Sequence, residues 1–273
     1  MCATRARRQR RTAAAPGTGR ERALAGGRNG NWPGGSGSRA PPAVPPSLGG
    51  LRLAVLGRRA LDADAARWLQ RLTHLGADDA AYWQADCADA DSLHAALASI
   101  RQRYGACHGV IHCAGVLQDG FFLRQPAQER ASVLQGKTLA ARHLDAATAD
   151  DPLKLFMVCS SLAGVYGNVG QSAYALANAW LDRFVQARQQ RCASGQRQGR
   201  SLSIAWPLWQ TDNGMQAPAP VRQWLARHGL ALLPSDQGVA TFLRCLALAQ
   251  AVLIPVCGKR DAVARLFGIE APP

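Results

Sequence analysis

The fold of this chain is decided by residues 153–178, which read LKLFMVCSSLAGVYGNVGQSAYALAN. Leu153–Cys159 is a short apolar run, which predicts a strand buried inside a sheet. The polar pair Ser160 and Ser161 follows it directly, and Gln171–Arg191 then shows the pattern of a helix. A buried strand that leads through a polar turn into a helix is the repeating unit of a parallel sheet.

The same alternation of short apolar runs and amphipathic stretches continues on both sides of this unit. Further strands are predicted at residues 51–57, 80–85, 110–113, 202–206 and 251–256. Further helices are predicted at residues 62–75, 89–104 (capped by Asp89), 127–149, 219–228 and 235–248, with a short one beyond Lys259. Such alternation needs crossover connections, so the predicted fold class is α/β, with a Rossmann-like, doubly wound parallel sheet. Ligands of these sheets bind beyond the carboxyl ends of the strands.

Length, composition and cysteine usage are those of a globular protein of the cytoplasm. The 273 residues are 48% hydrophobic, but no apolar run reaches the ~18 residues that a membrane span needs. The Arg-rich start lacks the apolar core of a secretory signal. The eight cysteines form no C-x-x-C pair, which argues against a zinc site and a disulfide framework. We therefore expect a cytoplasmic protein without membrane contact or a bound metal.

The first 50 residues differ from the rest in composition. They hold nine of the 32 basic residues but only one of the 18 acidic ones, Glu21, and they are rich in Gly, Ala, Pro and Ser. Because so few large apolar side chains cannot offset the entropy of the chain, this segment is predicted to be disordered. The predicted domains are a disordered basic segment at 1–50, an α/β domain at 51–268 and a tail at 269–273.

Four polar side chains are expected to meet at the carboxyl edge of the predicted sheet. Ser161 follows a strand, Tyr174 and Asn178 share one face of the next helix, and Lys137 lies near the middle of the preceding one. A Tyr phenol can donate a proton to a carbonyl oxygen that a Ser hydroxyl holds, and an ammonium stabilises the phenolate. An Asn side chain can orient the lysine or hold a water. Each residue alone fits an ordinary structural role, so only their joint placement predicts carbonyl reduction.

Four motifs connect this prediction to a known family. They are GVIHCAGVLQDG at residues 109–120, CSSLAGVYGNVGQ at 159–171, YALAN at 174–178 and IAWPLW at 204–209. In order and spacing these motifs resemble the ketoreductase (KR) domains of modular polyketide synthases, which belong to the short-chain dehydrogenase/reductase superfamily. The resemblance covers residues 51–268 and is strongest to synthases whose acyltransferase acts in trans.

The resemblance implies an enzyme that uses NADPH to reduce a β-ketoacyl thioester, carried on an acyl carrier protein, to the D-β-hydroxyacyl thioester. The other domains of a polyketide synthase are then further partners. The positions that match the catalytic residues of the family are Lys137, Ser161, Tyr174 and Asn178. Tyr174 is implied as the proton donor, Ser161 as the hydrogen-bond donor to the carbonyl, and Lys137 as the stabiliser of the phenolate.

Further positions match the cofactor and substrate sites of the family. Arg58 matches the residue that binds the 2′-phosphate of NADPH, for which a guanidinium is well suited. The other implied cofactor-binding residues are Asp86 and Cys87 beside the adenine, Ala114 and Gly115 beside the nicotinamide ribose, and Tyr174 and Pro207. Asp119 matches the final Asp of a Leu-Asp-Asp motif, and Tyr166 stands where the opposite stereochemical class carries Trp, which implies the D alcohol. Residues 207–219 resemble a mobile lid over the substrate.

One part of a dinucleotide-binding sheet has no counterpart in the sequence pattern. Such a sheet begins with a strand and a Gly-rich turn that opens a helix, because the N–H groups of that turn bind the pyrophosphate. Neither Gly17–Gly19 nor Gly34–Gly37 follows an apolar strand. The first strand, phosphate loop and first helix are therefore expected to be missing or mistranslated, with residues 1–50 a frame-shifted or wrongly started product. Such a chain is expected to leave an unpaired edge inside the sheet and to bind NADPH weakly.

The sequence leaves two other functions open. The first is a non-catalytic ketoreductase remnant that docks neighbouring domains, which would fold without binding NADPH. The second is a nucleic-acid binder that uses residues 1–50 as a basic arm and binds DNA in a salt-dependent way. The remaining residues carry only +6 of the net charge of +14, which disfavours the second alternative.

Overall fold

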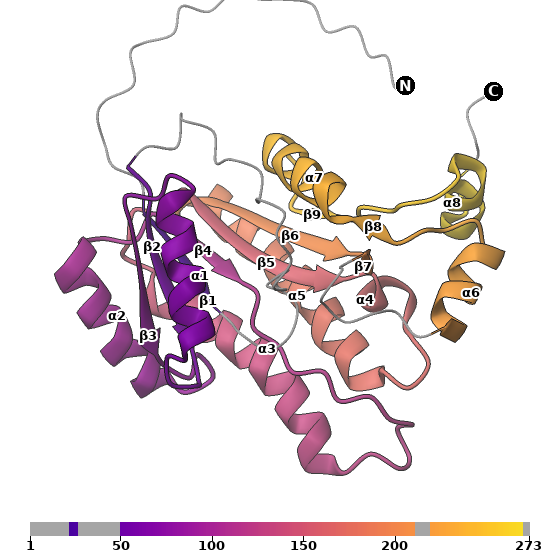
Figure 1. Cartoon of the computed structure of the whole chain (residues 1–273), viewed down its shortest axis with the longest axis horizontal. Helices are drawn as coiled ribbons and strands as arrows, with labels where there is room; N and C mark the ends of the chain where they lie inside the picture. Colours follow the sequence, from indigo (N-terminus) through magenta and orange to yellow (C-terminus); the bar gives the residue numbers. More distant parts are fainter. Residues whose placement is uncertain (1–21, 27–49, 211–218, 270–273) are drawn as a thin grey trace, which may run out of the picture.

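The structure, a computed structural model, describes residues 22–26, 50–210 and 219–269 (Figure 1). Its strands are β1 (Arg22–Gly26), β2 (Arg52–Gly57), β3 (Asp79–Gln84), β4 (Gly109–His112), β5 (Leu155–Ser161), β6 (Arg200–Trp206), β7 (Trp209–Gln210), β8 (Leu233–Pro234) and β9 (Val252–Leu253). Its helices are α1 (Ala63–His74), α2 (Ala90–Tyr104), α3 (Ala127–Ala147), α4 (Ala163–Tyr166), α5 (Ser172–Ala193), α6 (Ala219–Arg227), α7 (Ser235–Ala247) and α8 (Arg260–Phe267). Strands and helices alternate along most of the chain, as the sequence predicts.

Seven of the described strands form one sheet in the order β3-β2-β1-β4-β5-β6-β9. Every neighbouring pair is parallel, so each connection crosses over a face of the sheet. The strand order reverses between β1 and β4, which is the switch point where doubly wound sheets bind their ligands. The predicted Rossmann-like α/β fold is confirmed.

The prediction that the first strand is missing is wrong, and so is the prediction of disorder for residues 22–26. β1 lies between β2 and β4, where Leu24 is paired with Ala54 on one side and with Val110 on the other. The composition did not reveal it because a short central strand is held by main-chain hydrogen bonds to two neighbours and needs few large side chains of its own. The expected unpaired edge between β2 and β4 is therefore filled. Residues 27–49, where a phosphate loop and first helix would follow, lie outside the described part of the chain.

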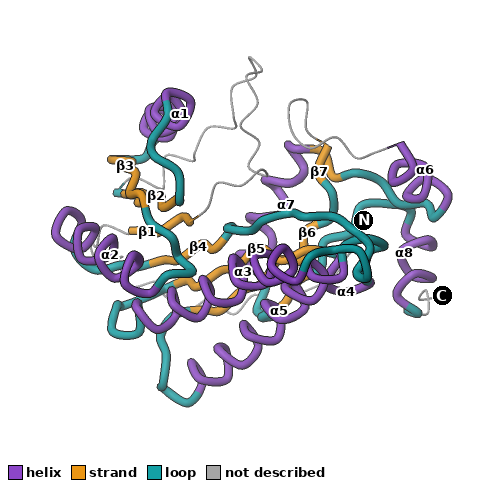
Figure 2. The backbone as a smooth tube through the Cα atoms, turned by 90° about the horizontal axis from the view of Figure 1, so that it is seen from below, coloured by secondary structure: helices purple, strands orange, loops and turns teal. Residues whose placement is uncertain are grey.

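Helices cover both faces of the sheet (Figure 2). On one face α2, α3 and α5 pack over a core that includes Leu97, Phe156 and Val158. On the opposite face, where α1 also lies, α7 packs over Met157 and Ile204. Successive residues of β5 thus enter different cores, because side chains along a strand alternate between its two faces.

Element boundaries agree with the sequence to within a few residues. The predicted cap of α2 is confirmed, since the side chain of Asp89 accepts a hydrogen bond from the N–H of Ser92 at 2.8 Å. The predicted strand at 251–256 is shorter in the structure, where β9 comprises only Val252–Leu253. The sequence did not predict α4, β7 and β8, because elements of two to four residues are too short to show a period. Among the described residues, no helix is long and apolar enough to cross a bilayer.

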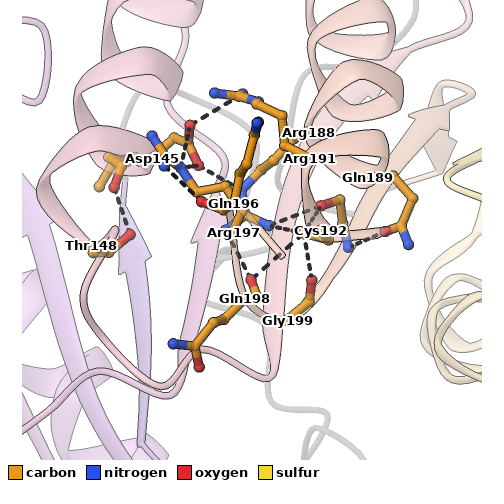
Figure 3. A network of polar contacts seen from close by, with 12 residues as sticks. Asp145, Thr148, Arg188, Gln189, Arg191, Cys192, Gln196, Arg197, Gln198 and Gly199 are labelled. Atoms are coloured by element: carbon orange, nitrogen blue, oxygen red, sulfur yellow. Dashed lines mark hydrogen bonds and ion pairs between the residues drawn. The ribbon is translucent and has the colours of Figure 1, made fainter. Parts of the chain in front are cut away.

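A buried group of charges joins α3 to α5 (Figure 3). The carboxylate of Asp145 on α3 lies 2.7 Å from Nε of Arg188 on α5. Arg191 and Arg197 each place a guanidinium nitrogen 3.2 Å from the same carboxylate. Arg188 is 1% exposed and also donates to Oγ of Ser201 at 2.8 Å. Because buried charges are stable only when they are paired and hydrogen-bonded, this group fixes α3 against α5.

Candidate active site

Lys137 is the side chain that connects three elements at the carboxyl edge of the sheet. It lies on α3 and is 5% exposed. Its Nζ donates to the main-chain carbonyl of Cys159 in β5 at 3.1 Å, and it lies 5.5 Å from the ring centroid of Tyr174 on α5. An ammonium at this distance from an aromatic ring is held by cation–π attraction. The structure therefore brings the predicted catalytic lysine between the strand and the helix that carry the other predicted catalytic residues.

Tyr174 and Asn178 lie one turn apart on α5, as the spacing predicts. Nδ2 of Asn178 donates to the carbonyl of Tyr174 at 2.8 Å, and the carbonyl of Asn178 accepts from Oγ of Ser160 at 3.2 Å. Asn178 is 0% exposed, and its Oδ1 has no hydrogen-bond partner among the described residues. Since buried polar atoms normally have partners, an oxygen without one is unusual at this depth.

Ser161 is the last residue of β5, so the strand runs two residues beyond the end that the sequence predicts. Its Oγ accepts a hydrogen bond from the N–H of Ala163, the first residue of α4, at 3.2 Å. α4 then packs tightly against α5, since a Cβ added at Gly164 would lie 2.8 Å from the main-chain nitrogen of Ala179. Ser161 thus ends the strand that holds Lys137, next to the helix that carries Tyr174.

His112 and Gly115 support Lys137 from β4 and the loop after it. Nε2 of His112 lies 3.0 Å from the carbonyl oxygen of Lys137, and the imidazole is 1% exposed. Burial, and then the charge of Lys137, lowers the pKa of His112 to about 4. The imidazole is therefore neutral at pH 7, and Nε2 carries the proton donated to that carbonyl. A Cβ added at Gly115 would lie 2.9 Å from Cε of Lys137, so a larger residue at this point would require the end of the lysine side chain to shift.

A cleft opens at the carboxyl ends of β2, β3 and β4, beside the switch point of the sheet. Five of the predicted cofactor-binding residues line it together, namely Arg58, Asp86, Cys87, Ala114 and Gly115. The other two predicted residues lie outside this lining: Tyr174 is on α5, and Pro207 is buried just after β6. The ends of neighbouring parallel strands at a switch point are where nucleotides bind to this class of fold.

The turn that carries Arg58 is held by two residues that the sequence analysis did not single out. Oη of Tyr82 donates to the carbonyl of Arg59 at 2.5 Å, and Nε2 of Gln84 donates to the carbonyl of Arg58 at 3.1 Å. Both residues belong to β3, where Gln84 is in register with Gly57 of β2. The two-residue spacing of Tyr82 and Gln84 indicates that they lie on the same side of the strand. Only the strand register shows that this side is next to the turn after β2.

Asp86 and Cys87 follow β3 and have different surroundings. A carboxylate oxygen of Asp86 accepts from the N–H of Ala88 at 2.9 Å. Cys87 is buried, and burial together with the charge of Asp86 raises the pKa of its thiol to about 11. The Cys87 thiol is therefore uncharged at neutral pH. No group of three His, Cys, Asp or Glu residues in the described part of the chain could hold a metal ion.

The two residues predicted to control stereochemistry lie on separate segments near the site. The carboxylate of Asp119, in the loop after β4, accepts from Nε2 of Gln171 at 2.9 and 3.0 Å. Tyr166 ends α4, and its ring packs edge-on against Phe267 of α8 with centroids 5.0 Å apart. Gln171 is a further residue that the sequence analysis missed as a support for the site. Most of the predicted lid, residues 211–218, lies outside the described residues.

Comparison with known proteins shows the family. The KR domain model matches residues 47–211. Polyketide synthase ThaG of Burkholderia thailandensis is 42% identical over 184 residues, and polyketide synthase PksL of Bacillus subtilis is 39% identical over 184 residues. Each match covers 67% of this chain, but only 3% of ThaG and 4% of PksL, so the chain spans a small part of the length of these relatives.

Solved structures agree with the family model. A ketoreductase domain from the bacillaene assembly line is 29% identical with a TM-score of 0.78, and the match covers 90% of this chain and 58% of that one. An N-terminal ketoreductase from the macrolactin assembly line is 33% identical with a TM-score of 0.70, over 79% of this chain and 41% of that one. The chain belongs to the KR domain family of polyketide synthases, within the short-chain dehydrogenase/reductase superfamily.

Proposed function

We propose that this domain reduces a β-ketoacyl thioester to the D-β-hydroxyacyl thioester, with NADPH as the reductant. The observation that carries the proposal is the position of Lys137. Its Nζ binds the carbonyl of Cys159 and lies 5.5 Å from the ring of Tyr174, while its stem packs against Gly115, which lines the cleft. One side chain therefore joins the groups proposed for proton transfer to the cleft proposed for the cofactor.

The residues of the cleft fit the adenosine half and the nicotinamide ribose of NADPH. Arg58 would bind the 2′-phosphate, because a guanidinium matches the charge and geometry of a phosphate. Asp86 and Cys87 would lie beside the adenine, and Ala114 and Gly115 beside the nicotinamide ribose. The absence of a side chain at Gly115 lets the main chain approach the catalytic residues closely. NADPH, when bound, supplies the hydride that the carbonyl carbon accepts.

The chain's own residues would position the ketone and supply the proton. The Ser161 hydroxyl would donate a hydrogen bond to the substrate carbonyl oxygen, and the Tyr174 phenol would donate its proton to the same oxygen. The Lys137 ammonium beside the Tyr174 ring would stabilise the phenolate that remains. The unpartnered Oδ1 of Asn178 would hold a water that returns a proton to the site.

The family supports the proposed partners and location. Because the relatives are polyketide synthases of which this chain matches a small part, the substrate would arrive on an acyl carrier protein. Other domains of such an assembly line would be further partners, and the protein would act in the cytoplasm.

The stereochemical part of the proposal depends on Asp119. Its carboxylate is fixed by Gln171, directly before the helix that carries Tyr174, so it would define one side of the substrate's approach. Chiral analysis of the alcohol formed from a β-ketoacyl surrogate tests this part. The D alcohol is expected, and an excess of the L alcohol would refute it.

The function itself is tested by fluorescence titration of the whole chain with NADPH, followed by turnover of a β-ketoacyl N-acetylcysteamine thioester. A version in which residues 27–49 are replaced by a Gly-rich loop and a helix is titrated in parallel, because it separates the contribution of a phosphate loop from that of the cleft. Saturable binding and consumption of NADPH are expected. A folded chain that binds NADPH in neither version would contradict the proposal and would instead favour a docking role.

A further inference from the structure

Two cysteines meet at the carboxyl ends of β4 and β5, beside the proposed active site. Cys113 directly follows β4, Cys159 lies in β5, and the paired residues just before them are His112 and Val158. The two side chains therefore point to the same face of the sheet. Their Sγ atoms lie 2.9 Å apart, and both are half-buried thiols.

The general spacing of neighbouring strands is compatible with a covalent bond between the two sulfurs. Neighbouring strands lie about 4.8 Å apart. A disulfide accepts Cα–Cα separations of about 4.4–6.8 Å. The register pairs His112 with Val158 just before the two cysteines, so closing the bond requires the sulfurs to approach from 2.9 Å to about 2.05 Å.

The surroundings of Cys159 lower the pKa of its thiol. A hydrogen bond from Cys113 and the charge of Lys137 lower the pKa of the Cys159 thiol, against the opposing effect of burial. The thiolate is the nucleophile in disulfide exchange, so a lower pKa favours reaction at neutral pH. At Cys87 and Cys245, by contrast, burial raises the pKa of the thiol.

We propose that Cys113 and Cys159 are a covalent modification site, a dithiol that low-molecular-weight disulfides convert to an intramolecular disulfide. The Cys159 thiolate attacks one sulfur of the reagent, so that a mixed disulfide forms and one reagent thiolate leaves. Cys113 loses its proton, attacks the Cys159 sulfur and releases the second reagent thiolate. The protein loses two electrons and gains one S–S bond, the reagent is reduced as its S–S bond breaks, and both thiol protons end on the released thiols.

The bond would act on the reductase site, and this consequence rests on the proposed function. Cys159 supplies the carbonyl that binds Nζ of Lys137, and Cys113 lies two residues before Gly115, which the Lys137 stem contacts. Drawing the two strand ends together therefore displaces Lys137 relative to Tyr174. Because misplacing reacting groups by about 1 Å can cost about a hundredfold in rate, kcat/KM is expected to fall by about tenfold to a hundredfold.

The test uses the whole chain, equilibrated in glutathione buffers that range from fully reduced to fully oxidised. Intact mass detects the loss of two hydrogen atoms, peptide mapping identifies the linked cysteines, and NADPH-dependent turnover is measured on the same samples. We expect a peptide that links Cys113 to Cys159, a parallel fall in activity, and recovery of both after treatment with dithiothreitol.

Variants identify the site independently of the activity. Cys113→Ser and Cys159→Ser are each expected to abolish the linked peptide. The matched control is Cys257→Ser, which replaces a half-buried cysteine elsewhere in the chain. It is expected to form the peptide that links Cys113 to Cys159 as the wild type does. Failure of the wild type to link Cys113 with Cys159 in any buffer overturns the proposal, and a link that leaves turnover unchanged overturns its effect on the enzyme. If the fully reduced chain shows no turnover, the proposed function is refuted. Intact mass and peptide mapping then still test whether Cys113 and Cys159 form a disulfide.

Discussion

The α3–α5 helix pair, which carries Lys137, and the turn that carries Arg58 both reach the carboxyl edge of the sheet, but they are held in different ways. In the helix pair, Lys137 is 5% exposed, and the ion pair between Asp145 and Arg188 joins the two helices in the interior. In the turn, Arg58 is exposed, and its main-chain carbonyl is held by the side chain of Gln84. The first region is fixed by buried side chains, and the second by hydrogen bonds to its main chain.

This difference separates the proposed chemistry from the proposed recognition of the cofactor. A substitution in the helix pair disturbs buried groups, so it changes stability or the reaction itself. A substitution of the exposed Arg58 side chain leaves the main-chain contacts of the turn in place, so it changes affinity and not the fold.

The largest effect is expected from Tyr174→Phe, which removes the proposed proton donor but keeps the ring beside Lys137. The value of kcat/KM for a β-ketoacyl surrogate is expected to fall by about 10²–10⁴-fold, the usual contribution of a positioned acid. NADPH affinity, measured by fluorescence titration, is expected to be unchanged. Retention of half the wild-type rate would exclude Tyr174 from the proposed chemistry.

The next largest effect is expected from Asp145→Asn, which leaves the buried Arg188 without its carboxylate partner. Breaking a buried ion pair in this way is expected to lower the free energy of unfolding by about 3–5 kcal/mol, measured by urea denaturation. The double variant Asp145→Leu with Arg188→Met is the control, and it is expected to lose less because no fully buried charge stays unpaired, while Arg191 and Arg197 are partly exposed to water. A single variant as stable as the wild type would show that the pair does not hold the helices together.

The third largest effect is expected on the free energy of unfolding when the pH is lowered, because His112 then becomes protonated. Its pKa is about 4 in the folded chain, against an ordinary value of 6.5, so the unfolded chain binds more protons between these pH values. Protonation of His112 therefore leaves the free energy of unfolding unchanged above pH 6.5. As the pH falls from 6.5 towards 4, that free energy decreases by about 1.4 kcal/mol per pH unit. Urea denaturation over this range should show a shallower pH dependence for His112→Gln than for the wild type. Equal slopes would mean that His112 is not held neutral in the fold.

The smallest effect is expected from Arg58→Gln, at the exposed turn. Loss of a charge-assisted contact to a phosphate is expected to weaken NADPH binding by about tenfold to a hundredfold, corresponding to about 1.5–3 kcal/mol. Binding of NADH, which lacks the 2′-phosphate, and the urea midpoint are expected to change little. Equal losses for both nucleotides would show that Arg58 does not recognise the 2′-phosphate.

Much of the fold could be predicted because parallel strands buried on both faces are strongly apolar runs. Leu51–Gly57 and Leu153–Cys159 show this, and both form strands of the main sheet. β1 could not be predicted, because its sequence RALAG has only one large apolar residue and lies in a segment rich in Arg and Gly. Its place depends on pairing with β2 and β4, which no local pattern encodes.

The candidate site could be predicted as a set of residue types, but not as a set of contacts. The four-residue spacing of Tyr174 and Asn178 on one helix was visible in the sequence. The hydrogen bond from Lys137 to the carbonyl of Cys159 depends on how α3 packs against β5. The hydrogen bond from Gln84 to the carbonyl of Arg58 depends on the strand register. Such contacts join segments far apart in the chain, so periodicity and spacing carry no information about them.

The central claim is that Lys137 joins the cofactor cleft to the proton donor, and product analysis with the matched variant Lys137→Met tests it most directly. NADPH consumed and β-hydroxyacyl thioester formed are measured together for both chains, with NADPH binding confirmed by fluorescence. The account predicts one alcohol per NADPH for the wild type, and a variant that binds NADPH but forms product much more slowly. A wild-type chain that binds NADPH and leaves the ketone unreduced, or a variant as fast as the wild type, would contradict it.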